Sequence, residues 1–266
     1  MDMQIADCHV HAEALDQRSL ELMALAGVKA VISHTSLPEA YENIPSQAIF
    51  DFADRMLGFH SWRTSKFFID TYVCVGVSMV GVPIDYEEAL ARLPGYLDKE
   101  RVVGIGEIGL EPSSATCPDL DTQEKILKAQ LTMAKEYAKP VAIHTPPVDK
   151  PRWAERYLAM VRDLRLDPCQ VIVDHADDSV AKTIIDSGCN AAITVQPWRR
   201  LKPADAARIV QATGTDRMLI DSDCSILESD PLSVPKTAFE MRKLGMSESD
   251  IRKVVWENPR KLFKLG

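Results

Sequence analysis

The sequence of 266 residues lacks the features of a membrane protein or of a secreted, disulfide-bonded protein. No apolar run reaches the roughly 18 residues of a membrane-spanning helix, so we expect no membrane association. The first residues show no basic segment followed by a long apolar one, so no signal peptide is expected. The six cysteines form no CxxC pair. This pattern indicates reduced, buried thiols in a cytoplasmic protein.

An excess of positive charge is also missing. The chain has 31 Lys and Arg against 39 Asp and Glu, a net charge of −8. This balance does not favour nucleic acid as a partner, although metal ions can carry phosphate contacts locally. Two phosphate-binding motifs are absent as well: GxGxxG after the first predicted strand, and GxxxxGK[ST]. The nucleotide-binding forms of an open, doubly wound sheet therefore lack support.

Short apolar stretches alternate with amphipathic ones from one end of the chain to the other. Because the apolar stretches are nearly continuous in apolar character, they are typical of strands buried on both faces, as in a parallel sheet. The predicted strands occupy residues 3–10, 28–35, 70–78, 101–109, 140–145, 170–176, 189–196 and 217–223. Spacings of i, i+3 and i+4 predict helices at 16–27, 85–99, 121–138, 177–188, 202–214 and 247–263.

Eight strands, each followed by a helix, within about 250 residues are the pattern of a TIM barrel. We therefore expect an α/β fold with a single (β/α)8 barrel domain over 1–266, and an open doubly wound sheet is the alternative. The longest interval between strands, 36–69, is rich in aromatic residues. It predicts a helical insertion after strand 2 of the barrel.

Polar residues gather where the predicted strands end, which is the end of a barrel that carries active sites. They are His9, His11, Glu107, His144, His175, Asp221 and Asp223. Each of them alone could be a hydrogen-bonded structural residue or a helix cap. Together, charged groups at the ends of apolar strands require compensation. Imidazole and carboxylate are ligands for Zn, Mn or Fe, and the set therefore predicts a metal site.

Alternation along a strand places Asp7, His9 and His11 on one face. Asp7 lies deeper than the two histidines, and we expect it to orient a ligand rather than to be one. Asp221 and Asp223 also share a face. Asp223 is nearer the mouth and is the expected ligand, while Asp221 is expected to orient a ligand.

The chain resembles the TatD-like metal-dependent hydrolases of the amidohydrolase superfamily in six motifs that occur in the family's order. They are "DCHVH", "GEIGLE", "VAIHT", "VDHA", "LIDSDCS" and "ENPRKLF". The resemblance implies a (β/α)8 barrel with one or two divalent metal ions, zinc first and Mn, Mg or Fe as alternatives. It also implies hydrolysis by a metal-bound hydroxide.

The resemblance assigns a role to each matching residue. His9 and His11 would hold the first metal with Asp223. Glu107 would bridge to a second metal held by His144 and His175, and Asp223 would also be the general base. The chain departs from the family at Glu111, where an Asp is usual, and after Asp223, where Cys224 and Ser225 replace a Pro. These departures and the segment 36–69 leave the substrate open.

The loops after the fifth and seventh predicted strands combine cationic and aromatic residues. With the strand-end His34, they supply the expected substrate contacts Lys150, Arg152, Trp198 and Arg199. Such residues can bind a phosphate or carboxylate group, although they can equally begin solvated helices. The leading hypothesis is a hydrolase of an ester, lactone, amide or phosphoester in a small, anionic substrate. The alternatives are a nuclease or phosphodiesterase, and a metal-binding partner protein without turnover. The oligomeric state is not predicted.

Overall fold

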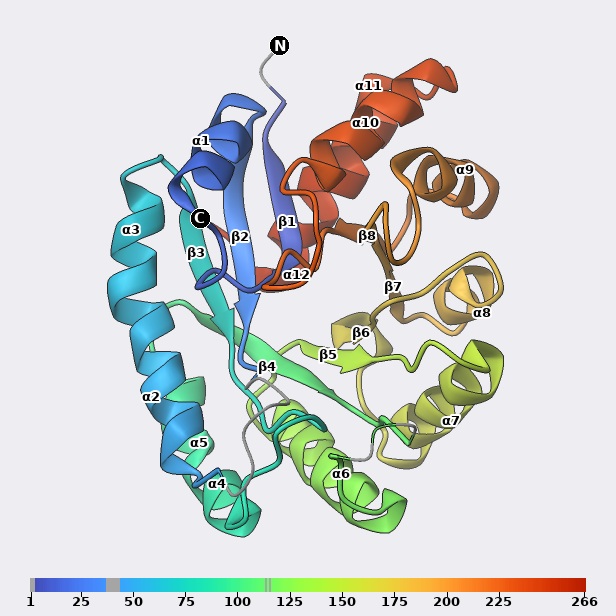
Figure 1. Cartoon of the computed structure of the whole chain (residues 1–266). Coiled ribbons are helices and arrows are strands. Elements are labelled where there is room, and N and C mark those ends of the chain that lie inside the picture. Colours follow the sequence, from blue (N-terminus) through green and yellow to red (C-terminus); the bar gives the residue numbers. More distant parts are fainter. Residues whose placement is uncertain (1–2, 37–43, 113, 115) are drawn as a thin grey trace.

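A computed structural model describes residues 3–36, 44–112, 114 and 116–266. Eight parallel strands pair in chain order and form the barrel in Figure 1. They are β1 (Ile5–Val10), β2 (Val28–His34), β3 (Asp70–Cys74), β4 (Val102–Gly109), β5 (Val141–His144), β6 (Val171–Val173), β7 (Asn190–Thr194) and β8 (Met218–Asp221). A parallel bridge joins Val10 of β1 to Cys224, in the segment that follows β8, and the backbone N–H of His11 donates to the carbonyl of Cys224 at 2.8 Å. The predicted (β/α)8 barrel is confirmed.

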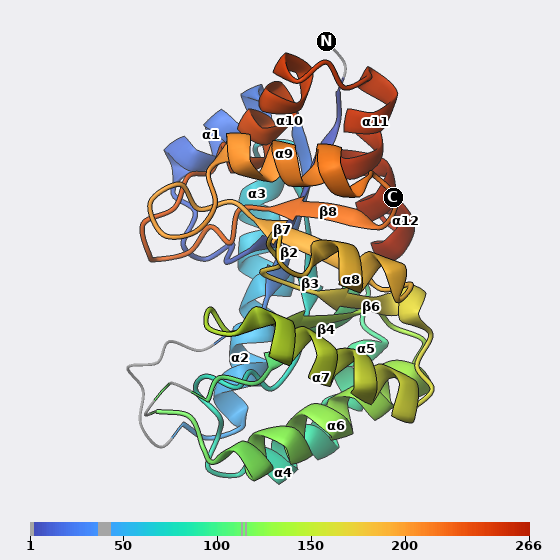
Figure 2. The same cartoon turned by 90° about the vertical axis from the view of Figure 1, so that its right-hand side faces the viewer.

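Helices surround the strands, as the two views in Figures 1 and 2 show. The α-helices before β5 are α1 (Gln17–Leu25), α2 (Gln47–Arg55), α3 (Ser61–Ser65), α4 (Tyr86–Arg92), α5 (Pro94–Leu97) and α6 (Leu120–Glu136). Those after β5 are α7 (Lys150–Asp163), α8 (Ala181–Asp186), α9 (Pro203–Thr213), α10 (Ser233–Lys243), α11 (Glu248–Arg252) and α12 (Asn258–Phe263). Helices α7 and α10 were not among the predicted ranges. In the described residues, no helix has the length and apolar character needed to cross a membrane.

The helical segment predicted after strand 2 forms the connection from β2 to β3. Helix α2 continues into a π-helical turn, η1 (Met56–His60), and then into α3. The backbone at both junctions, Arg55 and Ser61, is helical, so the run is continuous. Residues 37–43 of the predicted segment lie outside the described residues. A second π-turn, η3 (Lys253–Glu257), separates α11 from α12, and a short 3-10 helix, η2 (Pro168–Gln170), precedes β6.

Apolar side chains of the strands divide between two clusters, because successive residues face opposite sides of the sheet. Large side chains such as Ile105, Ile143 and Ile193 pack with the helices. A separate cluster combines mostly small strand residues with the C-terminal segment: Ala6, Cys8, Ala30, Ala142 and Ala192 with Trp256, Leu262 and Phe263. The potential ligands follow this cluster towards the carboxyl ends of the strands: His9 comes after Cys8 and His144 after Ala142.

Candidate metal centre

A bulge in β1 places His9 at the site. Between Asp7 and Val10 the strand advances three residues while β2 advances two, from Val31 to Ser33. This extra residue interrupts the alternation of side chains. Simple alternation therefore no longer supports the expectation that Asp7 shares the face of His9, and that expectation stays a prediction.

Asp7 instead connects β1 to the end of β8. Its Oδ1 accepts the backbone N–H of Ser222 at 3.0 Å and that of His9 at 3.4 Å. Burial raises the pKa of Asp7 to about 6. These contacts fix the backbone on both sides of the site, at His9 and beside Asp223. They support the prediction that Asp7 orients a ligand, which stays a prediction.

A second bulge, in β4, presents Glu107. Ile105 to Ile108 spans three residues of β4 against two of β5. At Gly106, a Cβ would lie 3.0 Å from Nδ1 of His34 and 3.1 Å from Cβ of Ala142, closer than side chains normally approach. Only glycine therefore fits at Gly106, immediately before Glu107, without displacing a neighbour.

Two further site residues lie just beyond the ends of their strands in the left-handed backbone region. His175, after β6, has φ +56°, and Asp223, after β8, has φ +42°. Residues other than glycine rarely adopt this conformation, and each costs roughly 1–3 kcal/mol. Surrounding contacts must therefore hold both residues in place, which is common at functional sites.

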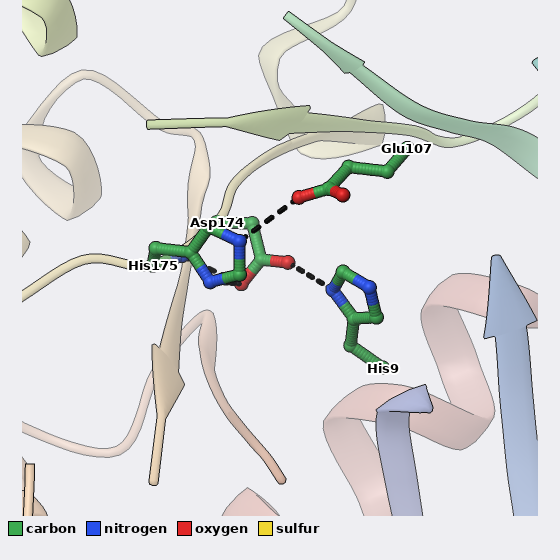
Figure 3. Close-up of side chains that lie close together, drawn as sticks. All are labelled: His9, Glu107, Asp174 and His175. Atoms are coloured by element: carbon green, nitrogen blue, oxygen red, sulfur yellow. Dashed lines mark hydrogen bonds and ion pairs between the residues drawn. The ribbon is translucent and has the colours of Figure 1, made fainter. Parts of the chain in front are cut away.

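Glu107 is the centre of one group of potential ligands. Its Oε1 lies 2.9 Å from Nδ1 of His144 and 2.9 Å from Nε2 of His175. Figure 3 shows Glu107 and His175 beside His9 and Asp174. Each of these four buried residues offers one potential metal-ligand atom, and the four atoms all lie within 4.8 Å of one another.

A second group shares His9 with the first. The Oδ1 atom of Asp223 lies 3.4 Å from Nε2 of His11 and 3.8 Å from Nε2 of His9. The structure therefore brings the six predicted ligands together in two adjoining groups. His9 belongs to both groups, and Glu107 lies with it in the first.

Each of the four histidines faces the site with one ring nitrogen and a separate acceptor with the other. The outward pairs are His9 Nδ1 with Asp174 Oδ2 (2.6 Å), His11 Nδ1 with Glu13 Oε1 (3.8 Å), His144 Nε2 with Glu111 Oε2 (3.4 Å) and His175 Nδ1 with Thr194 Oγ1 (2.7 Å). Metal-ligating histidines typically use the second nitrogen in this way. None of these four acceptors is predicted from the sequence to have a role, and Glu111 stands out there only as a departure from the family.

Asp174 is held by more contacts than its bond to His9. Its Oδ1 accepts the backbone N–H of His175 at 2.6 Å and the hydroxyl of Thr194 at 3.3 Å. Because both oxygens are already bonded, Asp174 fits an orienting role better than a ligand's. Its signal in the sequence is the motif "VIVDHA": alternation from Ile172 places Asp174 on the inward face.

Charges within the site are strongly coupled. Burial opposes ionisation of Glu107, but the charges of His144 and His9 outweigh it and hold its pKa well below the usual range. Burial likewise lowers the pKa of His9, while Glu107 and Asp174 outweigh it and hold that pKa well above the usual range. For His144, the carboxylate of Glu107 overcomes burial and raises the pKa to about 8.

The hydrogen bonds around His175 and His9 test whether these residues fit a metal ion. Thr194 donates its proton to Asp174, so it accepts the Nδ1–H of His175. Burial, followed by the charge of Arg200, lowers the pKa of His175, which favours the neutral ring. The bare Nε2 of that ring then faces Oε1 of Glu107 at 2.9 Å with no proton between them. The buried Nε2 of His9 also has no hydrogen-bond partner among the described residues. A divalent cation would bind the bare Nε2 of His175 beside the carboxylate of Glu107 and would displace the proton from Nε2 of His9, so the residues fit one.

Asp221 and Asp223, at the end of β8 and just beyond it, differ in the direction in which their pKa is shifted. Burial raises the pKa of Asp223, but the hydrogen bond from His11 and the charge of His9 outweigh it, and the net shift is downward. Asp221 is fully buried, and in the described part of the chain its carboxyl oxygens have no hydrogen-bond partner. Burial and the charge of Asp174 raise its pKa well above the usual range. The choice of Asp223 over Asp221 as the ligand is consistent with this difference and stays a prediction.

The predicted substrate contacts occupy different environments. His34 is buried against His9, with ring centroids 4.1 Å apart, and burial lowers its pKa to about 3. Lys150, at the start of α7, donates to the carbonyl of His175 at 2.6 Å and lies 3.2 Å from Oδ2 of Asp177. The remaining three predicted contacts, Arg152, Trp198 and Arg199, are exposed. Their contact with a substrate is untested.

Comparison with known proteins places the chain among metal-dependent hydrolases. The family model described as "TatD related DNase" matches residues 6–264. An uncharacterized metal-dependent hydrolase of Methanocaldococcus jannaschii is 29% identical over 259 residues, 97% of this chain and 99% of the relative. The crystal structure of a TatD-like protein from Archaeoglobus fulgidus superposes with a TM-score of 0.79 and 26% identity, covering 98% of this chain and 100% of that one. A TatD homolog from Escherichia coli K12 shares the fold at 16% identity, with a TM-score of 0.72 and complete coverage of both chains.

Proposed function

The chain belongs to the TatD-related DNase family, and from that premise we propose that this metal-dependent hydrolase acts on a small, anionic substrate. The bond cleaved would be an ester, lactone, amide or phosphoester. The observation that carries the proposal is the position of Glu107 between two groups of histidines, one of which also contains Asp223.

The donor set suggests how metal would be held. His9, His11 and Asp223 would hold one ion, His144 and His175 a second, and Glu107 would lie between them. We propose zinc, because a mixture of imidazole and carboxylate ligands suits it. When bound, such an ion supplies a Lewis acid and lowers the pKa of water, so that a nucleophile is available near neutral pH.

Asp223 is the proposed general base. Its net downward pKa shift keeps the carboxylate ionised, the form that a general base must have. The side chain is 14% exposed, so the attacking water can reach it. Asp223 would accept the proton of that water and later deliver it to the leaving group. Asp221 is buried and lacks this access to water, so its proposed role is to orient a ligand.

Cations near the histidines support an anionic substrate. The charge of Arg200 acts on His144, His175 and Lys150 and contributes to lowering the pKa of Lys150 and His175. Two positive charges at one side of the site suit a carboxylate or phosphate group of the substrate. The exposed residues Arg152, Trp198 and Arg199 would contact parts of the substrate further from the metals.

Two other functions remain as alternatives to the proposal. The family description names DNases, and a nuclease would share the same metal chemistry. Against an extended nucleic acid stands the net charge of −8. The other alternative is a metal-binding partner protein without turnover. The departure from the family at Cys224 and Ser225, after Asp223, is compatible with it.

A substrate screen with an Asp223 variant separates these functions. Zinc-loaded and manganese-loaded protein is assayed on p-nitrophenyl esters, lactones, amides, bis(p-nitrophenyl) phosphate and single-stranded DNA. We expect turnover of a small anionic substrate, and a loss of about 10²–10⁴-fold in kcat for Asp223→Asn with far less loss of metal. Faster release of mononucleotides from DNA than turnover of any small substrate would favour the nuclease. Absence of turnover with every metal and substrate would contradict hydrolysis.

A further inference from the structure

Gln196 lies beside the site and has no role in the proposed chemistry. It follows β7 by two residues and is fully buried. Its backbone is well anchored, because its carbonyl accepts the N–H groups of Arg199 at 3.0 Å and Arg200 at 2.7 Å. A bridge between Val195 and Leu201 closes the same loop. The side chain of Gln196 therefore starts from a fixed position.

Both contacts of the Gln196 amide nitrogen are to one residue, Asp223. The Nε2 atom donates to the backbone carbonyl of Asp223 at 2.9 Å and to its Oδ2 at 3.1 Å. Because both partners are acceptors, the orientation of the amide is determined: the NH₂ group must face Asp223.

The oxygen of the same amide, in contrast, makes no hydrogen bond within the described residues. This atom, Oε1 of Gln196, is buried. Burying a carbonyl oxygen without a hydrogen-bond partner lowers stability. The side chain therefore leaves its oxygen unpaired while its nitrogen makes two hydrogen bonds to Asp223. This arrangement indicates that the side chain serves to hold Asp223.

Asp223 requires this support for two reasons. Its backbone is in the left-handed region, and it lies beyond the last ladder residue of β8, Asp221. With Oδ2 bonded to Gln196, Oδ1 is the oxygen left facing the Nε2 atoms of His9 and His11. The bond thereby selects one oxygen of the carboxylate for the metal side.

We propose that Gln196 is a positioning residue that holds Asp223 in its ligating orientation. The inference rests on the proposed role of Asp223 as a ligand. It predicts that loss of the amide weakens metal binding about 10- to 100-fold, the usual effect of removing a group that orients a ligand.

Gln196→Met tests this inference, because it keeps the length of the side chain and removes the amide. The matched control is Gln130→Met, because Gln130 is equally buried but bonds the backbone of Val77 through both amide atoms, at 2.8 and 2.9 Å. Zinc affinity is measured by competition with a chromophoric chelator, thermal unfolding is measured on the metal-free proteins, and the visible spectrum is recorded after cobalt loading.

We expect Gln196→Met to lose zinc affinity 10- to 100-fold and to change the cobalt spectrum, while Gln130→Met lowers the melting temperature and leaves both metal properties as in the wild type. Equal zinc affinity in Gln196→Met and the wild type would overturn the inference, as would equal losses in both variants. Asp223→Asn, measured in parallel, distinguishes the two failures. If it too keeps wild-type affinity, the proposed role of Asp223 fails; if it loses affinity while Gln196→Met does not, only the positioning role fails.

Discussion

Oδ2 of Asp174 lies 2.6 Å from Nδ1 of His9, in a pair that is almost completely buried. This bond leaves Nε2 as the nitrogen of His9 that faces the other potential ligands. It connects the end of β6 to β1 across the barrel. The orientation of the first predicted ligand therefore depends on a residue more than 160 positions later in the chain.

Replacing Asp174 should weaken the metal site without removing a ligand. In Asp174→Asn the charged acceptor for His9 is lost, and we expect zinc affinity to fall about 10- to 100-fold. The measurement is chelator competition on the purified protein. Asp186→Asn is the control, because Asp186 lies exposed on α8 and pairs with Lys182. Equal affinities in the two variants would contradict the orienting role of Asp174.

Adding one methyl group at Gly106 should disturb Glu107. In Gly106→Ala the new Cβ would meet His34 and Ala142 at 3.0–3.1 Å, and we expect a loss of about 1–3 kcal/mol in the free energy of unfolding, together with weaker zinc binding. Urea unfolding and zinc competition measure the two effects. Gly95→Ala is the matched control, because no atom lies within 4 Å of a Cβ there. If the Gly106 variant were as stable as this control, the described packing of the β4 bulge would be incorrect.

The pH dependence of the metal-free protein should report the pairing of His144 with Glu107. The pKa of His144 is about 8 in the folded protein against an ordinary value of 6.5. A raised pKa gives stability that is fully present below pH 6.5 and is lost as the pH rises through 8, about 2 kcal/mol in all. Unfolding of the wild type and of His144→Asn is compared at pH 6 and pH 9. We expect the stability difference between them to shrink by that amount; a difference that stays constant would refute the pairing.

Removing a cation beside the site should affect substrate binding more than turnover. For an anionic substrate, Arg200→Met should raise KM about tenfold or more and change kcat little, because a charge-assisted contact is lost. For an uncharged analogue the same variant should match the wild type. Arg208→Met, on the exposed face of α9, is the control. A lower kcat with unchanged KM would place Arg200 in the chemical step instead.

The sequence was sufficient for the architecture because buried parallel strands are nearly continuous in apolar character, and all eight were located. It was also sufficient to predict that the six proposed ligands lie close together, since barrel topology brings the ends of the strands together. It could not place Asp7, because alternation does not reveal the bulge in β1. Nor could it assign Asp174 or Gln196, whose partners, His9 and Asp223, are distant in sequence and are identified by three-dimensional contacts alone.

Diffraction from zinc-loaded crystals, recorded on both sides of the zinc absorption edge, tests the central claim most directly. We predict two anomalous peaks within coordination distance of Glu107, one also contacting His9, His11 and Asp223, and the other contacting His144 and His175. A single peak with the first of these ligand sets would limit the account to one metal. Peaks that do not involve Glu107 and His9, or none in protein that contains zinc, would contradict it.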